Sequence, residues 1–254
     1  YVPALQALDL FEVRSIVDAH EPRRELARRQ FPGAVIADTV RACCGARVDV
    51  WLIAVPPQAH FATASQALEQ GCHLYVEKPL TLDLREAQEL VTLARAARRV
   101  AATGYVERFA PAYLALRSQL QDRRGVSITS VQTQLTFDEV VTVPWKRSVE
   151  RGGGALNDIA VHHADLVCFL LDTEVVAVRA NTSSVRRPDD TAQVEFRLAN
   201  GALVDALFSS AAPAVNRLII RGETKEWRAA RVPARSPFER RIASWARRVA
   251  GPVA

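Results

Sequence analysis

The sequence contains no methionine and few cysteines. Because the chain begins with Tyr1, we expect that translation starts upstream and that any targeting segment lies outside this sequence. The 4 cysteines lack C-x-x-C spacing and are too sparse for a disulfide scaffold, which favours reduced thiols and argues against a metal site. They are Cys43, Cys44, Cys72 and Cys168. The expected location is therefore cytoplasmic.

Long apolar runs are absent as well. No stretch approaches the roughly 20 residues that a membrane helix needs, so we expect no membrane partner. The 49% of hydrophobic and 24% of charged residues are typical of a globular protein. The net charge of +5 comes largely from arginines, which are dense between residues 221 and 248. No nucleic-acid motif accompanies them, so we interpret them as a solvated surface; a nucleic-acid site would lose affinity steeply with salt.

Strand and helix patterns alternate along the first hundred residues. Apolar, β-branched segments predict strands at 11–18, 48–55, 72–76 and 100–104, and segments rich in helix formers predict helices at 21–30, 59–70 and 83–98. Such alternation is typical of an α/β fold with a parallel sheet between two layers of helices. Ligands of these sheets gather at the carboxyl ends of the strands.

The pattern changes after residue 124. Residues 127–137, 175–185 and 192–198 alternate polar and apolar side chains, as antiparallel strands with one wetted face do. Asn200-Gly201 predicts a tight hairpin, and a helix is expected at 156–171, after three glycines. We therefore expect an α/β domain over residues 1–104 and an α+β domain with an open antiparallel sheet over residues 105–254.

Asp18 is a candidate for binding a dinucleotide. It closes a predicted strand and precedes a predicted helix, where a carboxylate accepts hydrogen bonds from the adenosine ribose of NAD. An ordinary acidic residue in a turn is an equally good interpretation of Asp18 alone. Arg23 and Arg24 keep NADP possible.

Lys78 lies between Glu77 and Pro79 at the end of a predicted strand, which aims its ammonium group into the expected cleft. There it can hydrogen-bond a substrate hydroxyl and stabilise the negative charge that develops on it. The alternative is a surface lysine in a turn. The Lys78–Pro79 peptide bond is a candidate for the cis form, which would fix this aim.

Asp158 and His162 are four residues apart on the predicted helix, so both side chains point to one face. Histidine has the ordinary pKa best suited to taking a proton near neutrality. On its own, His162 is more often a structural residue than a base. His163 points elsewhere and is expected to be structural, and Asp165 fits either a substrate contact or a packing role.

Five segments, in this order and spacing, make a specific pattern. They are residues 17–18 (VD), 54–60 (AVPPQAH), 77–80 (EKPL), 104–111 (GYVERFAP) and 152–165 (GGGALNDIAVHHAD). With them the sequence resembles the Gfo/Idh/MocA family, the group of glucose-fructose oxidoreductase and inositol dehydrogenase. The resemblance runs along almost the whole chain and implies a Rossmann-like domain followed by a substrate-binding and oligomerisation domain.

The resemblance also implies roles for single residues. Lys78, Asp158 and His162 would be catalytic, with His162 as the base. Asp18, Pro56, His60, Glu77 and Lys78 would bind the cofactor, and Arg108 and Asp165 would lie near the substrate together with the catalytic residues.

One feature of the family is missing, namely the first strand with its G-x-G-x-x-G loop, and residues 1–5 (YVPAL) resemble the helix that follows this loop in the family. Because those glycines let the backbone approach the pyrophosphate, we expect this chain by itself to bind NAD poorly and to be a fragment of a longer product. The end of the chain also looks shorter than is usual for the family.

The function expected from these residues is hydride transfer between a ring hydroxyl of a sugar, nucleotide sugar or cyclitol and NAD, in a homodimer or homotetramer. The alternative is a catalytically silent family member that senses sugars, since a fold alone does not determine function. The presence of Lys78, Asp158 and His162 together favours the enzyme. Segment 104–111 slightly favours nucleotide sugars.

Overall fold

The computed structural model describes residues 10–43, 47–121 and 126–231. Cys44, the helix expected at residues 1–5 and most of the arginine-rich stretch 221–248 lie outside these ranges. Within the described residues, no helix is both long and apolar enough to cross a bilayer.

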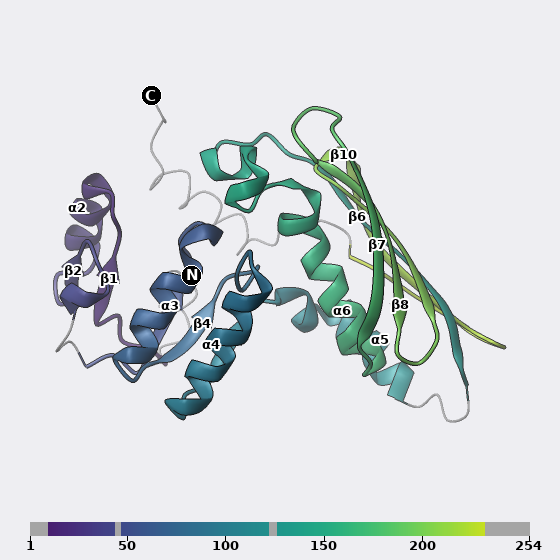
Figure 1. Ribbon diagram of the computed structural model, residues 1–254, viewed down its shortest axis with the longest axis horizontal. Coiled ribbons are helices and arrows are strands. Elements are labelled where there is room, and N and C mark those ends of the chain that lie inside the picture. Colours follow the sequence, from purple (N-terminus) through teal and green to yellow (C-terminus); the bar gives the residue numbers. More distant parts are fainter. Residues whose placement is uncertain (1–9, 44–46, 122–125, 232–254) are drawn as a thin grey trace.

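The first part of the chain forms two parallel sheets with helices beside them (Figure 1). The strands are β1 (Ser15–Val17), β2 (Val35–Ala37), β3 (Val50–Ile53), β4 (His73–Val76) and β5 (Ala101–Thr103), and the helices are α2 (Glu21–Gln30), α3 (His60–Glu69) and α4 (Leu84–Ala96). β1 pairs with β2, and β4 lies between β3 and β5. Among the described residues no strand joins the two sheets. The α/β alternation is confirmed, but the three-residue β2 was too short for its pattern to be noticed.

The core of this part lies between β3, β4 and one side of α3 and α4. Ala64 and Ala67 of α3 are fully buried, and Leu90 of α4 is buried with them against Ile53 and Val76. α4 begins where the Asp83 carboxylate accepts a hydrogen bond from the backbone N–H of Arg85. This packing fixes the carboxyl ends of β3 and β4, where the predicted motifs follow.

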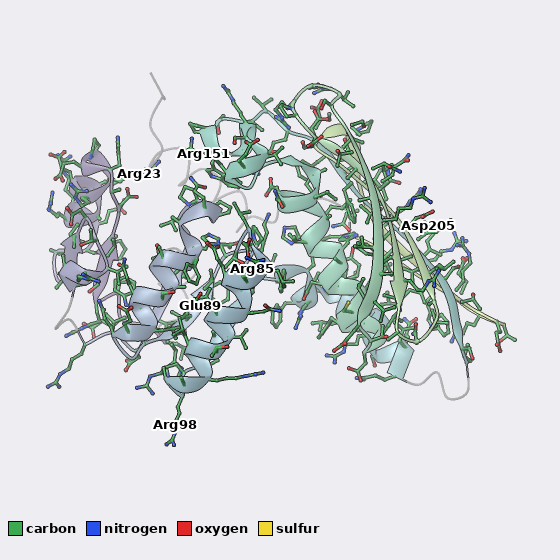
Figure 2. The ribbon with its side chains drawn as sticks, viewed as in Figure 1. Arg23, Arg85, Glu89, Arg98, Arg151 and Asp205 are labelled. Atoms are coloured by element: carbon green, nitrogen blue, oxygen red, sulfur yellow. The ribbon has the colours of Figure 1, made fainter. Side chains whose placement is uncertain are left out.

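The second part is a six-stranded sheet in the order β11-β10-β6-β9-β8-β7. Its strands are β6 (Ile128–Asp138), β7 (Val175–Ser183), β8 (Thr191–Leu198), β9 (Leu203–Ser209), β10 (Ala211–Gly222) and β11 (Glu226–Ala230). The helices α5 (Pro111–Gln121) and α6 (Val161–Leu171) cover the face toward the first part, and Asp205 stands on the open face (Figures 1 and 2). β8 buries every second side chain, as its pattern predicts.

The six-stranded sheet is antiparallel, as expected, at four of its five pairings. β6 and β9 run parallel, so the sheet is mixed. After β6 the chain leaves the sheet, passes through α6 and returns at the far edge as β7. β6 itself lies in the interior, between β10 and β9. Alternation along a strand reports which face is wetted but not the direction of a neighbour that is distant in sequence.

The helix expected at 156–171 also differs from the prediction. Its first turn and a half, Ala155–Ala160, is a π-helix, and α6 proper begins at Val161. Periodicity could not predict this, because a short π-helical stretch changes the apolar spacing too little. π-Helical turns are rare in proteins, and those that occur are often found at functional sites.

Candidate active site

The side chain of Lys78 reaches from the first part of the chain to a residue of the second part. It directly follows β4, its peptide bond to Pro79 is cis, and its side chain is 16% exposed. Its Nζ lies 2.6 Å from both the backbone carbonyl oxygen and the carboxylate Oδ1 of Asp158. The structure thus brings together two predicted residues that are 80 positions apart.

Asp158 is shared between two lysines. Its Oδ2 lies 2.7 Å from Nζ of Lys146, which also donates a hydrogen bond of 2.8 Å to Oε1 of Glu139. Burial alone would raise the pKa of Asp158, but Lys78 and Lys146 together hold that pKa below its ordinary value. Lys146 was missed in the sequence because it lies on a short 3-10 turn, Pro144–Arg147, with no periodic pattern or known spacing.

His162 stands beside this cluster at the start of α6. Burial and the charge of Lys78 lower the pKa of His162 to about 3, against the opposing effect of Asp158. The imidazole is therefore neutral near pH 7 and can accept a proton. Its Nδ1 is buried without a hydrogen-bond partner among the described residues. Such orphaned polar atoms are few in native structures, and catalytic sites are one place where they occur.

The glycine run lets three segments approach one another. Gly152 has a φ of 101°, and a Cβ added there would lie 2.7 Å from Cβ of Pro57, in the loop after β3. A Cβ on Gly153 would clash with the backbone carbonyl oxygen of Lys146. Larger residues would therefore push the π-helix away from both the first part of the chain and Lys146.

The residues expected on the cofactor side lie near the carboxyl ends of β1, β3 and β4. The Asp18 side chain is 29% exposed, and its Oδ1 accepts a hydrogen bond of 2.8 Å from the backbone N–H of His20. Pro56 is exposed in the loop after β3. Glu77 is partly buried, which raises its pKa, and its Oε2 accepts a hydrogen bond from the backbone N–H of Lys78.

His60 is placed differently from the expectation. It is only 1% exposed, and its Nδ1 and Nε2 lie 2.8 Å and 2.9 Å from the backbone carbonyl oxygens of Pro79 and Val55. Both ring nitrogens thus face the protein. The ring connects the loop after β3 to the loop that carries Lys78, and a contact of His60 with the cofactor stays a prediction.

Arg108 and Asp165 bind each other. Nε of Arg108 lies 2.7 Å from Oδ2 of Asp165, and a second hydrogen bond makes the pair bidentate. The guanidinium group also lies 5.2 Å from the centroid of the Phe169 ring. A role near the substrate stays a prediction for both residues. His163 is fully buried in the core, where Thr133 is its hydrogen-bond partner.

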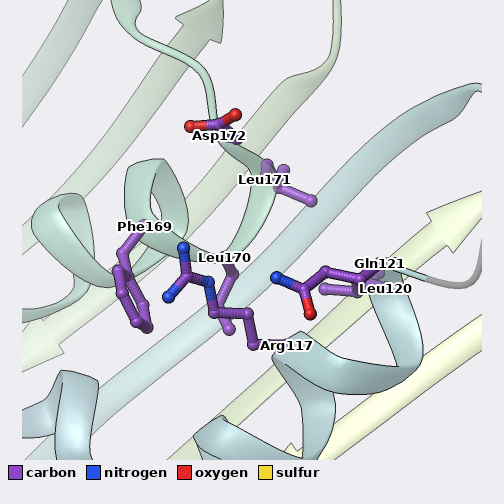
Figure 3. A pocket seen from close by; sticks show the side chains of 7 residues that line it. All are labelled: Arg117, Leu120, Gln121, Phe169, Leu170, Leu171 and Asp172. Atoms are coloured by element: carbon purple, nitrogen blue, oxygen red, sulfur yellow. The ribbon is translucent and has the colours of Figure 1, made fainter.

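A separate pocket lies at the C-terminal ends of α5 and α6 (Figure 3). It is lined by Arg117, Leu120, Gln121, Phe169, Leu170, Leu171 and Asp172. None of the residues predicted to act in catalysis lines it, so the candidate site is the cluster of charged side chains around Asp158.

Comparison with known proteins agrees with this geometry. Residues 1–105 match a model described as an oxidoreductase family with an NAD-binding Rossmann fold, and residues 113–228 match the GFO/IDH/MocA C-terminal domain. UDP-N-acetylglucosamine 3-dehydrogenase of Acidithiobacillus ferrooxidans is 30% identical over 191 residues, which are 74% of this chain and 54% of that protein. The scyllo-inositol 2-dehydrogenase (NAD(+)) of Bacillus subtilis is 26% identical over 141 residues, or 56% and 40%.

A solved structure agrees as well. GenD2 from gentamicin A biosynthesis, in complex with NAD, superposes with a TM-score of 0.82 at 26% identity, over 90% of this chain and 67% of GenD2. The chain thus spans about half the length, or less, of the two curated relatives, with 54% and 40%. Because the two family models match successive parts that together make up most of the sequence, this chain belongs to the Gfo/Idh/MocA family of oxidoreductases.

Proposed function

We propose that the protein is an NAD-dependent dehydrogenase that transfers hydride between a ring hydroxyl of a sugar, nucleotide sugar or cyclitol and the nicotinamide. One observation carries the proposal: Lys78 and Asp158, from two distant motifs, are in contact beside His162. The names of the relatives support this substrate class, since one acts on a UDP-linked amino sugar and another on an inositol.

The residues present fit NAD at two places. The exposed part of the Asp18 carboxylate at the end of β1 is suited to accept hydrogen bonds from ribose hydroxyls. Lys78 follows β4, at the end of the sheet where the nicotinamide would meet the substrate. When bound, NAD would accept the hydride. We propose that Pro56 and Glu77 line its nicotinamide half and that His60 holds the loops in place.

Lys78 would bind the reacting hydroxyl. An ammonium group has three hydrogens to donate, and two of those on Lys78 are directed at Asp158. The third would be donated to the substrate oxygen and would stabilise the negative charge on that oxygen as its proton leaves. Asp158 keeps the ammonium group in place.

His162 would take the proton. Oxidation of a carbinol to a carbonyl removes a hydride from carbon, which bound NAD would accept, and a proton from oxygen, which the imidazole would take. Because the pKa of His162 is lowered to about 3, the ring is ready to accept at neutral pH but is a weak base. Transfer therefore depends on Lys78 to make the hydroxyl more acidic.

The wider organisation is proposed on the same basis. We propose a domain boundary at residues 104–105, since β5 ends at Thr103 and the next helical turn begins at Val106. The open face of the six-stranded sheet would support a homodimer or homotetramer. The location proposed is the cytoplasm.

Calorimetric titration of NAD and NADP tests the proposal. The titration is made into the protein expressed from its complete reading frame, with the 254-residue chain in parallel. NAD binding, followed by NADH formation with a UDP-linked amino sugar, an inositol or a free hexose, is the expected result. If the complete protein binds neither cofactor, the enzyme proposal is wrong and the silent sugar sensor takes its place.

A further inference from the structure

Lys146 takes no part in the proposed transfer of hydride and proton, although it contacts Asp158. Its side chain is 22% exposed, and its Nζ lies between the carboxylates of Glu139 and Asp158. Burial alone would lower the pKa of Lys146, but these two carboxylates raise that pKa above its ordinary value, so Lys146 carries a firm positive charge.

The two oxygens of Asp158 are thereby divided between two lysines. Oδ1 binds Lys78 at 2.6 Å, and Oδ2 binds Lys146 at 2.7 Å. A carboxylate held at one oxygen only can rotate about its χ2 torsion, which is a broad one. A carboxylate held at both oxygens keeps one orientation. The ammonium group of Lys78, which binds Oδ1, is then held in one position as well.

The surroundings hold Lys146 in turn. Glu139 binds its ammonium group, and Arg187 donates a hydrogen bond of 3.0 Å to the backbone carbonyl of Glu139. Because Gly153 has no side chain, the backbone of Lys146 can lie directly against it. A Cβ at position 153 would clash with the carbonyl oxygen of Lys146. The position of Lys146 therefore rests on several independent contacts.

We propose that Lys146 is a positioning residue of the dehydrogenase: by holding Oδ2 of Asp158 it keeps Oδ1 on Lys78 and so aims Lys78 at the substrate hydroxyl. The inference rests on the proposed function. It extends the catalytic set of Lys78, Asp158 and His162 by a residue that acts through Asp158.

Lys146 also affects the base. The charged or titratable groups that act on His162 are Lys78 from the loop after β4, Lys146 from its 3-10 turn, Asp158 from the π-helix and His163 from α6. Both lysines lower the pKa of His162, and Asp158 raises it. Removing the charge of Lys146 leaves Asp158 less compensated and must raise that pKa.

The test replaces Lys146 in the complete protein. Lys146→Met removes the charge and the hydrogen bonds, and Lys146→Arg keeps both. For Lys146→Met we expect kcat to fall about 10- to 100-fold with little change in KM, as is usual when a supporting partner of a functional side chain is lost. We also expect the NMR titration midpoint of His162, assigned with His162→Gln, to rise. Lys146→Arg should restore most of both.

Two further variants keep the test decisive. Lys225→Met removes an exposed lysine in the turn between β10 and β11 and should change neither readout. Glu139→Gln weakens the hold on Lys146 and should lower kcat less than Lys146→Met, so it serves if that variant does not fold. A folded Lys146→Met protein with unchanged kcat and an unchanged His162 midpoint overturns the inference.

The NMR titration needs no turnover. If the unmodified protein oxidises none of the substrates offered, the proposed function fails, and the midpoint of His162 still decides whether Lys146 acts on this cluster. If the unmodified protein oxidises a substrate and Lys146→Met has the same kcat and the same His162 midpoint, only the role proposed for Lys146 is wrong.

Discussion

At the scale of the residue, His162 and His163 are neighbours with different tasks. Burial lowers the pKa of both, to about 3 and about 4. His163 points into the core toward Thr133, whereas His162 lies among the charges of Lys78 and Asp158. One step along a helix turns the side chain by more than a quarter of a circle, which is enough to separate a structural ring from a candidate base.

His162→Gln should remove the base and leave the binding of NAD intact. We expect kcat to fall by about 10²- to 10⁴-fold, the usual contribution of a positioned general base. Steady-state kinetics and calorimetry measure the two effects. His73→Gln is the matched control, because His73 lies at the other end of β4, where its ring accepts a hydrogen bond from the backbone N–H of Val100. Equal rates for the two variants would exclude His162 as the base.

At the scale of the element, the segment from Gly152 to Leu171 joins the site to the core. Its glycines allow close approach, its π-helical part carries Asp158, and α6 packs against the sheet. The backbone N–H of Ala155, at the start of the π-helix, donates a hydrogen bond of 2.7 Å to the carbonyl of Asp189. A contact before β8 thus helps to determine where the helix begins.

Gly153→Ala should disturb this segment. The new Cβ would clash with the carbonyl oxygen of Lys146, so the backbone has to shift, at a cost of about 1–3 kcal/mol in unfolding free energy, as for other overpacked sites. The turnover rate should fall as well, because Lys146 moves. Urea unfolding and kinetics measure both. The control is Gly33→Ala, where no atom lies within 4 Å of the added Cβ. Equal stability of the two variants would show that the contact between Gly153 and the carbonyl of Lys146 leaves room for a side chain.

α6 should make the stability of the protein depend on pH. The pKa of His163 falls from 6.5 to about 4 on burial. Between these pH values the unfolded chain binds a proton at this ring and the native state does not, so stability is full above pH 6.5 and declines as the pH falls toward 4. The loss amounts to about 3 kcal/mol.

His163→Gln tests this dependence, because glutamine can still hydrogen-bond Thr133 but does not titrate. Urea unfolding at a series of pH values should show a shallower decline for the variant than for the unmodified protein. A decline of the same slope in both proteins would mean that His163 is protonated in the native state.

At the scale of the whole molecule, the ion pair of Lys78 and Asp158 connects the parallel sheets to the six-stranded sheet. The approach of Gly152 to Pro57 connects the same two parts. A site assembled in this way depends on the relative position of both parts.

Lys78→Met should loosen this connection and abolish turnover. Removing one partner of a buried ion pair typically costs about 3–5 kcal/mol, and we expect a smaller loss because Lys146 still compensates Asp158. Hydrogen exchange at Ala155–Ala160 should accelerate. Lys225→Met, which removes an exposed lysine far along the chain, should leave exchange there unchanged. Unaltered exchange in Lys78→Met would show that the connection does not depend on this pair.

Local physical chemistry in the sequence determined the order and type of most elements. α2 begins and ends where its run of helix formers does, and β8 alternates as predicted because one of its faces is buried. The motifs around Lys78 and Asp158 could be found in the sequence because each is short and contiguous.

Only the tertiary structure decided what depends on residues distant in sequence. The parallel pairing of β6 with β9, the enclosure of His60 between two backbone carbonyls and the second lysine on Asp158 all arise from such contacts. The start of the π-helix is likewise bound to a distant residue, through the hydrogen bond from the backbone N–H of Ala155 to the carbonyl of Asp189, which local propensity does not encode. Periodicity records whether a side chain is buried, whereas only the folded chain determines which distant group it meets.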